Sequence, residues 1–283
     1  MCHPNISLFA DDSTATYSDF ILKNLLDKLK SEFAKVLEWL KTNKLIINLE
    51  KTYLMVFTNK ERPETISLNV NGSIIQERTE AKFLGVILDN KLTWHAHTKH
   101  ISSKISKSVA ILRMLRDTFP KHILKMLYLT LVYPYFNYCN LIWGTAYIST
   151  LNPLVILQKK CIRIICHAEF LAHTDPLFKS TNLLKLNQIH ELNCAIFIYK
   201  CFNLTAYANF KIRLTMSSQI HHYDTRRKDD IRTHHHRLHL GSQSFINKGI
   251  KLWNNLPSEI KCANSIFYFK TKMKNILRNT SNM

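Results

Sequence analysis

Two adjacent carboxylates, Asp11 and Asp12, are the side chains of this sequence best suited to chemistry, because they end a short apolar run. Neighbouring side chains of a strand point to opposite faces, so both acids can serve one site only at a sharp turn, such as a hairpin tip. Clustered carboxylate oxygens select Mg²⁺ or Mn²⁺, and a pair of such ions supports phosphoryl transfer. The alternatives are a solvated turn or a helix N-cap, with Ser13 and Thr14 capping the next helix.

The first 90 residues, which must position these acids, have an α+β pattern. Apolar residues recur every three or four positions over 17–40, which predicts an amphipathic helix packed across the sheet behind the acidic pair. The β-branched and aromatic runs 45–49 and 53–57 predict two strands. Asn71-Gly72 between 66–70 and 73–75 predicts a type I′ hairpin, and 83–88 predicts a further strand.

Helical periodicity replaces the strand pattern after Trp94. One helix has an apolar face from Ile101 to Leu115, with Lys104, Lys107 and Arg113 elsewhere on its surface. Further helical stretches follow. The first runs through 120–131 and is interrupted by Pro134. The others cover 154–164, 189–202, 244–253 and 267–277. Residues 205–242 are rich in basic residues and histidine, which predicts a flexible segment that includes Arg226, Arg227 and Lys228.

The charge of the chain is divided unevenly. The whole chain has 39 Lys and Arg against 20 Asp and Glu; residues 1–90 hold 11 against 12, which leaves 28 against 8 for residues 91–283. A neutral part that carries the acids therefore precedes a strongly basic part. This asymmetry indicates a metal-binding segment beside one that binds a polyanion, although a basic surface that serves only solubility is the alternative.

Cysteine and histidine spacing predicts no zinc site. The seven cysteines form no paired spacing and are odd in number, which favours a reducing compartment inside the cell, nucleus or cytoplasm, and buried free thiols. Consecutive residues do not face one site on a helix or strand, so a polar loop is the preferred interpretation of His234 to His236. No leader or membrane-spanning run is found, and we expect no membrane partner.

Several motifs together resemble the reverse transcriptases of non-LTR, LINE-type retrotransposons of the jockey group. The motifs are FADD at 9–12, EWLKTNKLIINLEKT at 38–52, AKFLGVILDNKLTWHAH at 81–97, YDTR at 223–226 and LWNNLP at 252–257. The resemblance implies part of an RNA-directed DNA polymerase. Residues 1–90 would be the C-terminal part of the palm, an antiparallel sheet with a packed helix; 91–170 a helical thumb; and 171–283 a basic, mostly helical C-terminal region.

The resemblance also implies roles for individual residues. Asp11 would bind both catalytic Mg²⁺ (or Mn²⁺) ions with Asp12 beside it, and Lys51 would protonate the departing pyrophosphate. Phe83, Leu84 and Gly85 would belong to the hairpin that grips the primer end. Lys104, Lys107 and Arg113 of the thumb would contact the phosphates of an RNA template paired with a DNA primer, or of duplex DNA. The alternatives are a solvated turn for Lys51 and an ordinary buried strand for 83–85.

The family's fingers and its earlier palm aspartate have no counterpart in this sequence, so we expect an N-terminally truncated polymerase without activity of its own. Asp19 is the only nearby acid, and it falls where a helix should start. The alternatives are a non-catalytic nucleic-acid-binding protein and a helical protein-interaction module. Trp94, Trp143 and Trp253 could stack on bases, but burial in a core is the preferred interpretation.

Overall fold

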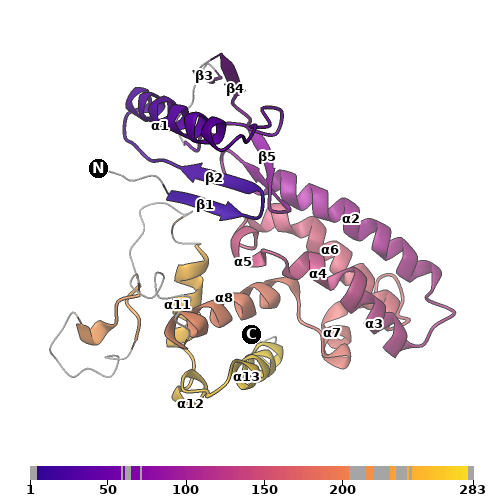
Figure 1. The fold of residues 1–283 in the computed structure, drawn as a ribbon. Coiled ribbons are helices and arrows are strands. Elements are labelled where there is room, and N and C mark those ends of the chain that lie inside the picture. The colour runs from indigo at the N-terminus through magenta and orange to yellow at the C-terminus, as the bar shows by residue number, and fades with distance from the viewer. Residues whose placement is uncertain are drawn as a thin grey trace. The chain divides into compact units, whose positions relative to one another are not determined.

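The structure is a computed structural model that describes residues 5–58, 60, 65–70, 72–203, 214–219, 230–233, 241 and 244–279 (Figure 1). The chain divides into two compact units, Met1–Leu92 and Thr93–Met283. The first combines small antiparallel sheets with one long helix, and the second consists mainly of helices. The α+β class predicted from the sequence is therefore confirmed.

Three separate two-stranded antiparallel sheets make up the β structure of the first unit. They pair β1 (Asn5–Phe9) with β2 (Asp12–Thr16), β3 (Ser67–Val70) with β4 (Ser73–Gln76), and β5 (Glu80–Phe83) with β6 (Val86–Asp89). The predicted Asn-Gly hairpin is confirmed by the pairing of β3 with β4. Gly72 has a φ of 82°, which the absence of a Cβ permits.

The helix α1 (Leu22–Thr42) packs on β3 and β4. Its side chains Leu29, Phe33 and Leu37 lie partly buried against Leu68 and Ile75, the buried pair of that hairpin. The expectation that this helix covers the strands behind the acidic pair was wrong. The apolar stripe fixes which face of α1 is buried, but it does not specify which sheet supplies the complementary surface.

The prediction of two strands between residues 45 and 57 was also wrong. Residues 45–48 have no regular secondary structure, and 49–51 form a turn in which the backbone N–H of Lys51 donates to the backbone oxygen and to Oδ1 of Asn48, both at 3.2 Å. In 53–57, Leu54 alone makes a β-bridge, to Glu77. The asparagine side chain offers the backbone a local partner, and without a neighbouring strand the β-branched residues cannot form a ladder.

The region 83–88 contains a hairpin and not the single strand that its composition predicts. Leu84 and Gly85, with φ angles of 44° and 81°, form the two-residue turn between β5 and β6. Positive φ at both positions is the geometry of a type I′ turn. The hairpin implied by the family resemblance is therefore present.

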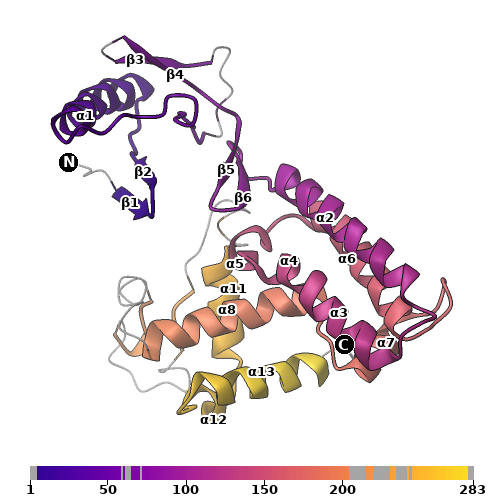
Figure 2. The ribbon, with the colours of Figure 1, turned by 45° about the vertical axis from the view of Figure 1, so that its right-hand side comes forward.

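The second unit is built around the helix α8 (Leu186–Asn203), which has buried residues on all its sides. It packs against α4 (Tyr133–Asn137), α5 (Asn140–Trp143), α6 (Ile148–Ile165), α11 (Phe245–Asn254) and α13 (Ile266–Asn279). The two views in Figures 1 and 2 show α8 running beside α13 and crossing α11. Gly249 permits that crossing, because a Cβ there would lie 2.8 Å from Cγ1 of Ile198.

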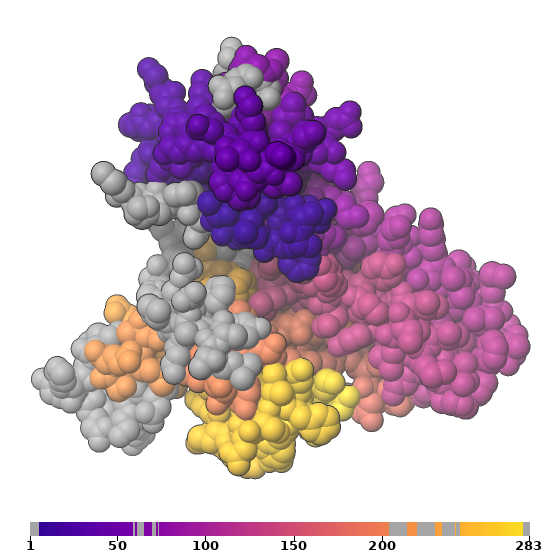
Figure 3. Space-filling view, in the orientation of Figure 1, coloured from indigo at the N-terminus to yellow at the C-terminus, as the bar shows by residue number. Residues whose placement is uncertain are grey.

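The remaining helices of this unit are α2 (His95–Met114), α3 (Lys121–Leu131), α7 (Thr174–Thr181) and the short α12 (Ser258–Lys261). The pair α2 and α6 form a second packed layer. The helices expected at 101–115, 120–131, 154–164, 189–202, 244–253 and 267–277 are confirmed as α2, α3, α6, α8, α11 and α13. Side chains of α13, in yellow, are visible on the face shown in Figure 3.

Aromatic residues form much of the core between α8, α11 and α13. Tyr199 stacks on Phe269 at 4.5 Å between ring centroids, and Phe202 stacks on Trp253 at 5.4 Å. Trp94, Trp143 and Trp253 have at most 5% of their surface exposed. The expectation that these tryptophans belong to the core is confirmed, and none of them is available to stack on a base.

Candidate functional site

The acidic pair lies at the tip of the first hairpin. Phe9 pairs with Asp12, so Ala10 and Asp11 form the two-residue turn, and Ala10 has a φ of 52°. Both carboxylates are exposed. The hairpin prediction is confirmed. The helix-cap alternative is wrong, because the next helix begins only at Leu22, where the Oδ1 of Asp19 accepts a hydrogen bond from the N–H of Ile21.

The pair provides ligands of the right kind for a divalent ion, whose remaining coordination positions waters or substrate phosphates would fill. Mg²⁺ requires near-octahedral oxygen coordination, and two carboxylates supply only part of that shell. No group of three or more His, Cys, Asp or Glu side chains able to hold a metal ion occurs among the residues that the structure describes. Within the described residues, the hairpin can therefore contribute two carboxylates to a metal site, and any further ligands must come from elsewhere.

Lys51 lies on an exposed turn after the helix α1. Within the described residues, no hydrogen bond or ion pair joins it to Asp11 or Asp12. The placement agrees with the alternative of a solvated turn lysine. The structure does not bring this ammonium into contact with the acidic pair.

The hairpin β5–β6 exposes Gly85 at its turn, while Phe83 and Leu84 are half-buried. An exposed glycine lets another backbone approach closely, which is the property needed to hold a strand end. This geometry is compatible with the predicted role of 83–85.

The helix α2 presents cations opposite its buried face. Its apolar side chains Ile101, Ile105, Val109 and Leu112 are at most 5% exposed and pack toward α6. The predicted cations Lys104, Lys107 and Arg113 are all exposed. Lys99 joins them on the outer face, because it lies about two turns before Lys107. We refer to Lys99, Lys104, Lys107 and Arg113 as the α2 cations.

No Asp or Glu occurs anywhere in α2, so the α2 cations have no carboxylate from their own helix to neutralise them. The sequence alone could have indicated Lys99, since its spacing from Lys107 corresponds to one helical face. Arg226, Arg227, Lys228 and His234 to His236 lie outside the described residues. Their predicted roles stay predictions.

A buried polar cluster that the sequence reasoning missed connects α5 with α8. Nδ1 of His190 lies 3.1 Å from the backbone oxygen and 3.2 Å from Oδ1 of Asn140, and Sγ of Cys194 lies 3.6 Å from its Nε2. Burial lowers the pKa of His190 to about 4 and raises that of Cys194 to about 12. A neutral imidazole and a neutral thiol, both buried, hold the helices together and do not provide a nucleophile.

Comparison with known proteins finds similar sequences among the polymerases of transposons. The chain is 28% identical to the probable RNA-directed DNA polymerase from transposon BS of Drosophila melanogaster over 182 residues, which is 63% of this chain and 20% of that protein. It is 26% identical to the probable polymerase from transposon X-element over 194 residues, and 27% identical to the polymerase from mobile element jockey of Drosophila funebris over 175 residues. Its relatives are RNA-directed DNA polymerases of transposons.

These matches confirm the predicted resemblance to the jockey group. The X-element match covers 65% of this chain and 21% of the relative, and the jockey match covers 61% and 19%. The chain therefore spans about a fifth of the length of the curated relatives that it matches. No family model and no solved structure matches it. In the part of the chain that the structure describes, no helix is both long and apolar enough to cross a bilayer.

Proposed function

We propose that this chain is a segment of a retrotransposon reverse transcriptase and that its own function within that enzyme is to bind the nucleic acid backbone. The first unit would be the C-terminal part of the palm, and the second would be the thumb with the C-terminal region. The relatives, which are RNA-directed DNA polymerases, support this assignment, as does the acidic hairpin. The bound form would be an RNA template with its DNA primer.

The observation that carries the proposal is the outer face of α2. It has four exposed cations and no acid along a helix of 20 residues. From Lys99 to Arg113 the helix rises about 21 Å, a length over which a nucleic acid duplex presents many phosphates. Lysine and arginine contacts with phosphates supply affinity without reading the base sequence.

The acidic hairpin would contribute to catalysis only within the complete enzyme. Asp11 and Asp12 would hold the divalent ions that activate the primer hydroxyl and stabilise the leaving oxygen. To hold two ions the pair would need further oxygen ligands from the rest of the enzyme, because no third His, Cys, Asp or Glu of the described residues joins it in a metal-binding group. We therefore propose that the 283-residue chain by itself binds nucleic acid without extending a primer.

Fluorescence anisotropy with a labelled RNA–DNA hybrid tests the proposal. Replacing all the α2 cations by glutamine should weaken binding at low salt and flatten the dependence of affinity on salt. A matched control replaces exposed lysines of α1, namely Lys23, Lys30, Lys35 and Lys41, by glutamine. The control has the same loss of charge on a helix of the first unit. Equal loss of affinity in both variants would reject α2 as the binding face.

A non-catalytic nucleic-acid-binding protein is the second candidate. The same α2 face favours it, because such binding requires neither the acidic pair nor a metal. The two candidates differ in the acidic hairpin. If Asp11→Asn and Asp12→Asn impair polymerisation when this segment is restored to a full-length relative, the hairpin has a catalytic role and the second candidate fails.

A further inference from the structure

Two large apolar side chains project into solvent at the turn 169–172, which follows α6. The turn is closed by a hydrogen bond from the N–H of Ala172 to the backbone oxygen of Glu169 at 3.1 Å. Its two central residues, Phe170 and Leu171, have 72% and 86% of their surface exposed. Glycine, proline and small polar residues are the usual occupants of such positions. Neither the turn nor burial in a core explains the presence of two large apolar residues here.

Two arginines hold this turn in place. Nε of Arg163 in α6 donates to the backbone oxygen of Ala172 at 2.9 Å, and Nη2 of Arg116 donates to the backbone oxygen of Ala168 at 3.2 Å. Arg116 follows the end of α2, and α2 and α6 run side by side (Figure 2). The turn is therefore fixed to the ends of both helices. Phe170 is held ready for a ligand, so binding would cost little ordering of the chain.

Other exposed apolar side chains lie at the same end of this helix pair. Met114, the last residue of α2, is 81% exposed, and Phe119 in the following loop is 37% exposed. Exposed apolar side chains that gather in one place mark an interaction site, whereas single scattered ones are ordinary. We refer to Met114, Phe119, Phe170 and Leu171 as the apolar tip.

The apolar tip continues the outer face of α2. Met114 comes seven residues after Lys107, which is about two turns, so both side chains lie on one side of the helix. The segments 113–121 and 163–173, which surround the tip, hold four Lys and Arg against two acids, so this end of the helix pair has a net positive charge. The two acids are Asp117 and Glu169. A row of cations along α2 thus leads to an apolar end.

A nucleic acid strand has the chemistry that this arrangement requires. Its phosphates would follow the cations along the helix, and an unpaired base would stack on an exposed aromatic ring. A lipid surface fits less well. A bilayer that met the tip end-on would leave Lys99 about 21 Å away, beyond the Debye length of about 8 Å, and one that lay along α2 would cover its charged outer face.

We propose that the apolar tip binds unpaired nucleotides of a strand that continues beyond a duplex, with one base stacked on Phe170. The inference rests on the proposed function, because the α2 cations would hold that duplex. Met114 and Leu171 would provide apolar surface beside the stacked base, and Arg113 would contact the phosphate where duplex and single strand meet. Stacking uses the face that every base has, so the tip would bind without sequence preference.

Fluorescence anisotropy on the full chain tests the inference with three probes. They are a blunt RNA–DNA hybrid, the same hybrid with a short single-stranded extension, and that extended hybrid with abasic sites throughout the extension. The abasic extension keeps the phosphates and lacks only the bases. We expect the extension with bases to bind about tenfold more tightly than the abasic one, because stacking on an aromatic ring favours each base. Equal affinity for the two extended probes would overturn the inference.

Two variants of the exposed Phe170 separate stacking from apolar contact. Phe170→Leu removes the ring but keeps an apolar side chain, and it should abolish the tenfold preference, whereas Phe170→Trp should retain it. The matched control is Phe267→Leu, which changes a phenylalanine of α13 that is 79% exposed, and it should leave the preference unchanged. A preference that survives in Phe170→Leu would overturn the inference, because a protein or lipid partner needs only an apolar side chain. A loss that is equal in Phe267→Leu would overturn it as well.

Failure of this inference and failure of the proposed function give different results. If replacing the α2 cations by glutamine leaves binding of the blunt hybrid unchanged, the proposed function fails. If that replacement weakens binding of the blunt hybrid while the wild-type chain binds the two extended probes equally, the proposed function stands and only the role of the apolar tip is rejected.

Discussion

Mild acid should destabilise the second unit through two buried histidines, His97 and His190. Burial is the main cause that lowers the pKa of each to about 4, from an ordinary value near 6.5; His100 adds to the effect at His97 and Lys248 at His190. Between these values the unfolded chain binds a proton at each histidine and the folded chain does not. Stability is therefore fully present above pH 6.5 and is lost as the pH falls toward 4.

The magnitude follows from proton linkage. Each histidine contributes about 1.4 kcal/mol per pH unit within this window, so the two together give a slope of about 2.7 kcal/mol per pH unit. Over the whole window the loss is on the order of 7 kcal/mol, which is comparable to the free energy of unfolding of an ordinary domain. Burial raises the pKa of Glu191, which opposes this loss as the pH falls. The pKa of Asp175 is lowered, so its own contribution is lost only below the window.

Urea unfolding followed by tryptophan fluorescence at closely spaced pH values from 4.5 to 7, a range set by the two histidine pKa values, measures the slope. His190→Gln removes one titrating group, and the slope should fall to about 1.4 kcal/mol per pH unit even though the variant is less stable throughout. The control is His122→Gln, which changes an exposed histidine of α3. A slope that stays the same in His190→Gln, or falls equally in His122→Gln, would refute the assignment of the acid sensitivity to the buried imidazoles.

Three further predictions follow from the geometry. The affinity of the chain for duplex DNA should fall as the salt concentration rises. When the α2 cations are replaced by glutamine, the slope of log K against log salt, measured by nitrocellulose filter binding, should become shallower by about 3.6. An unchanged slope in this variant would exclude phosphate contacts by α2. The purified chain should not extend a primer with Mg²⁺ or Mn²⁺, and extension that disappears in an Asp11→Asn, Asp12→Asn double variant would show that the chain forms a complete metal site. Gly85→Ala should destabilise the β5–β6 hairpin by about 1–2 kcal/mol, because Gly85 has a φ of 81°. Gly85→Asn should lower the stability less, since asparagine tolerates positive φ better than alanine. Equal losses of stability in thermal unfolding would mean that the positive φ is not the cause.

Local patterns in the sequence determined much of this protein. The periodicity of α2 and the pairing of β3 with β4 depend on interactions between residues close along the chain, so propensity and turn chemistry suffice to predict them. The hairpin beneath the acidic pair belongs to the same class, because a two-residue connection allows only an antiparallel return. The uneven charge of the two parts is likewise a property of the sequence itself.

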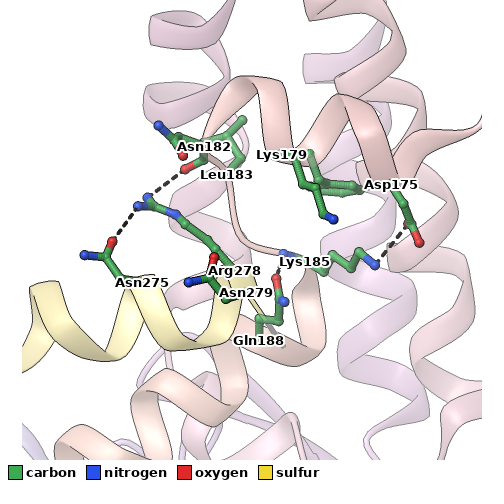
Figure 4. Close-up of a pocket in the computed structure, with 10 residues that line it drawn as sticks. Asp175, Lys179, Asn182, Leu183, Lys185, Gln188, Asn275, Arg278 and Asn279 are labelled. Atoms are coloured by element: carbon green, nitrogen blue, oxygen red, sulfur yellow. Dashed lines mark hydrogen bonds and ion pairs between the residues drawn. The ribbon is translucent and has the colours of Figure 1, made fainter. Parts of the chain in front are cut away.

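Contacts between distant residues were decided only by the tertiary structure. The sheet on which α1 packs depends on which apolar surface is complementary, and a stripe of leucines and phenylalanines fits many such surfaces. The cluster of Asn140 with His190 joins residues 50 positions apart, and the hydrogen bond from Arg278 to the backbone oxygen of Asn182 joins α13 to the end of α7 across 96 positions (Figure 4). No periodicity connects such positions. They meet only because burial of the apolar faces of α8 fixes how its neighbouring helices cross, and the hydrogen bonds of the buried polar groups then select one arrangement.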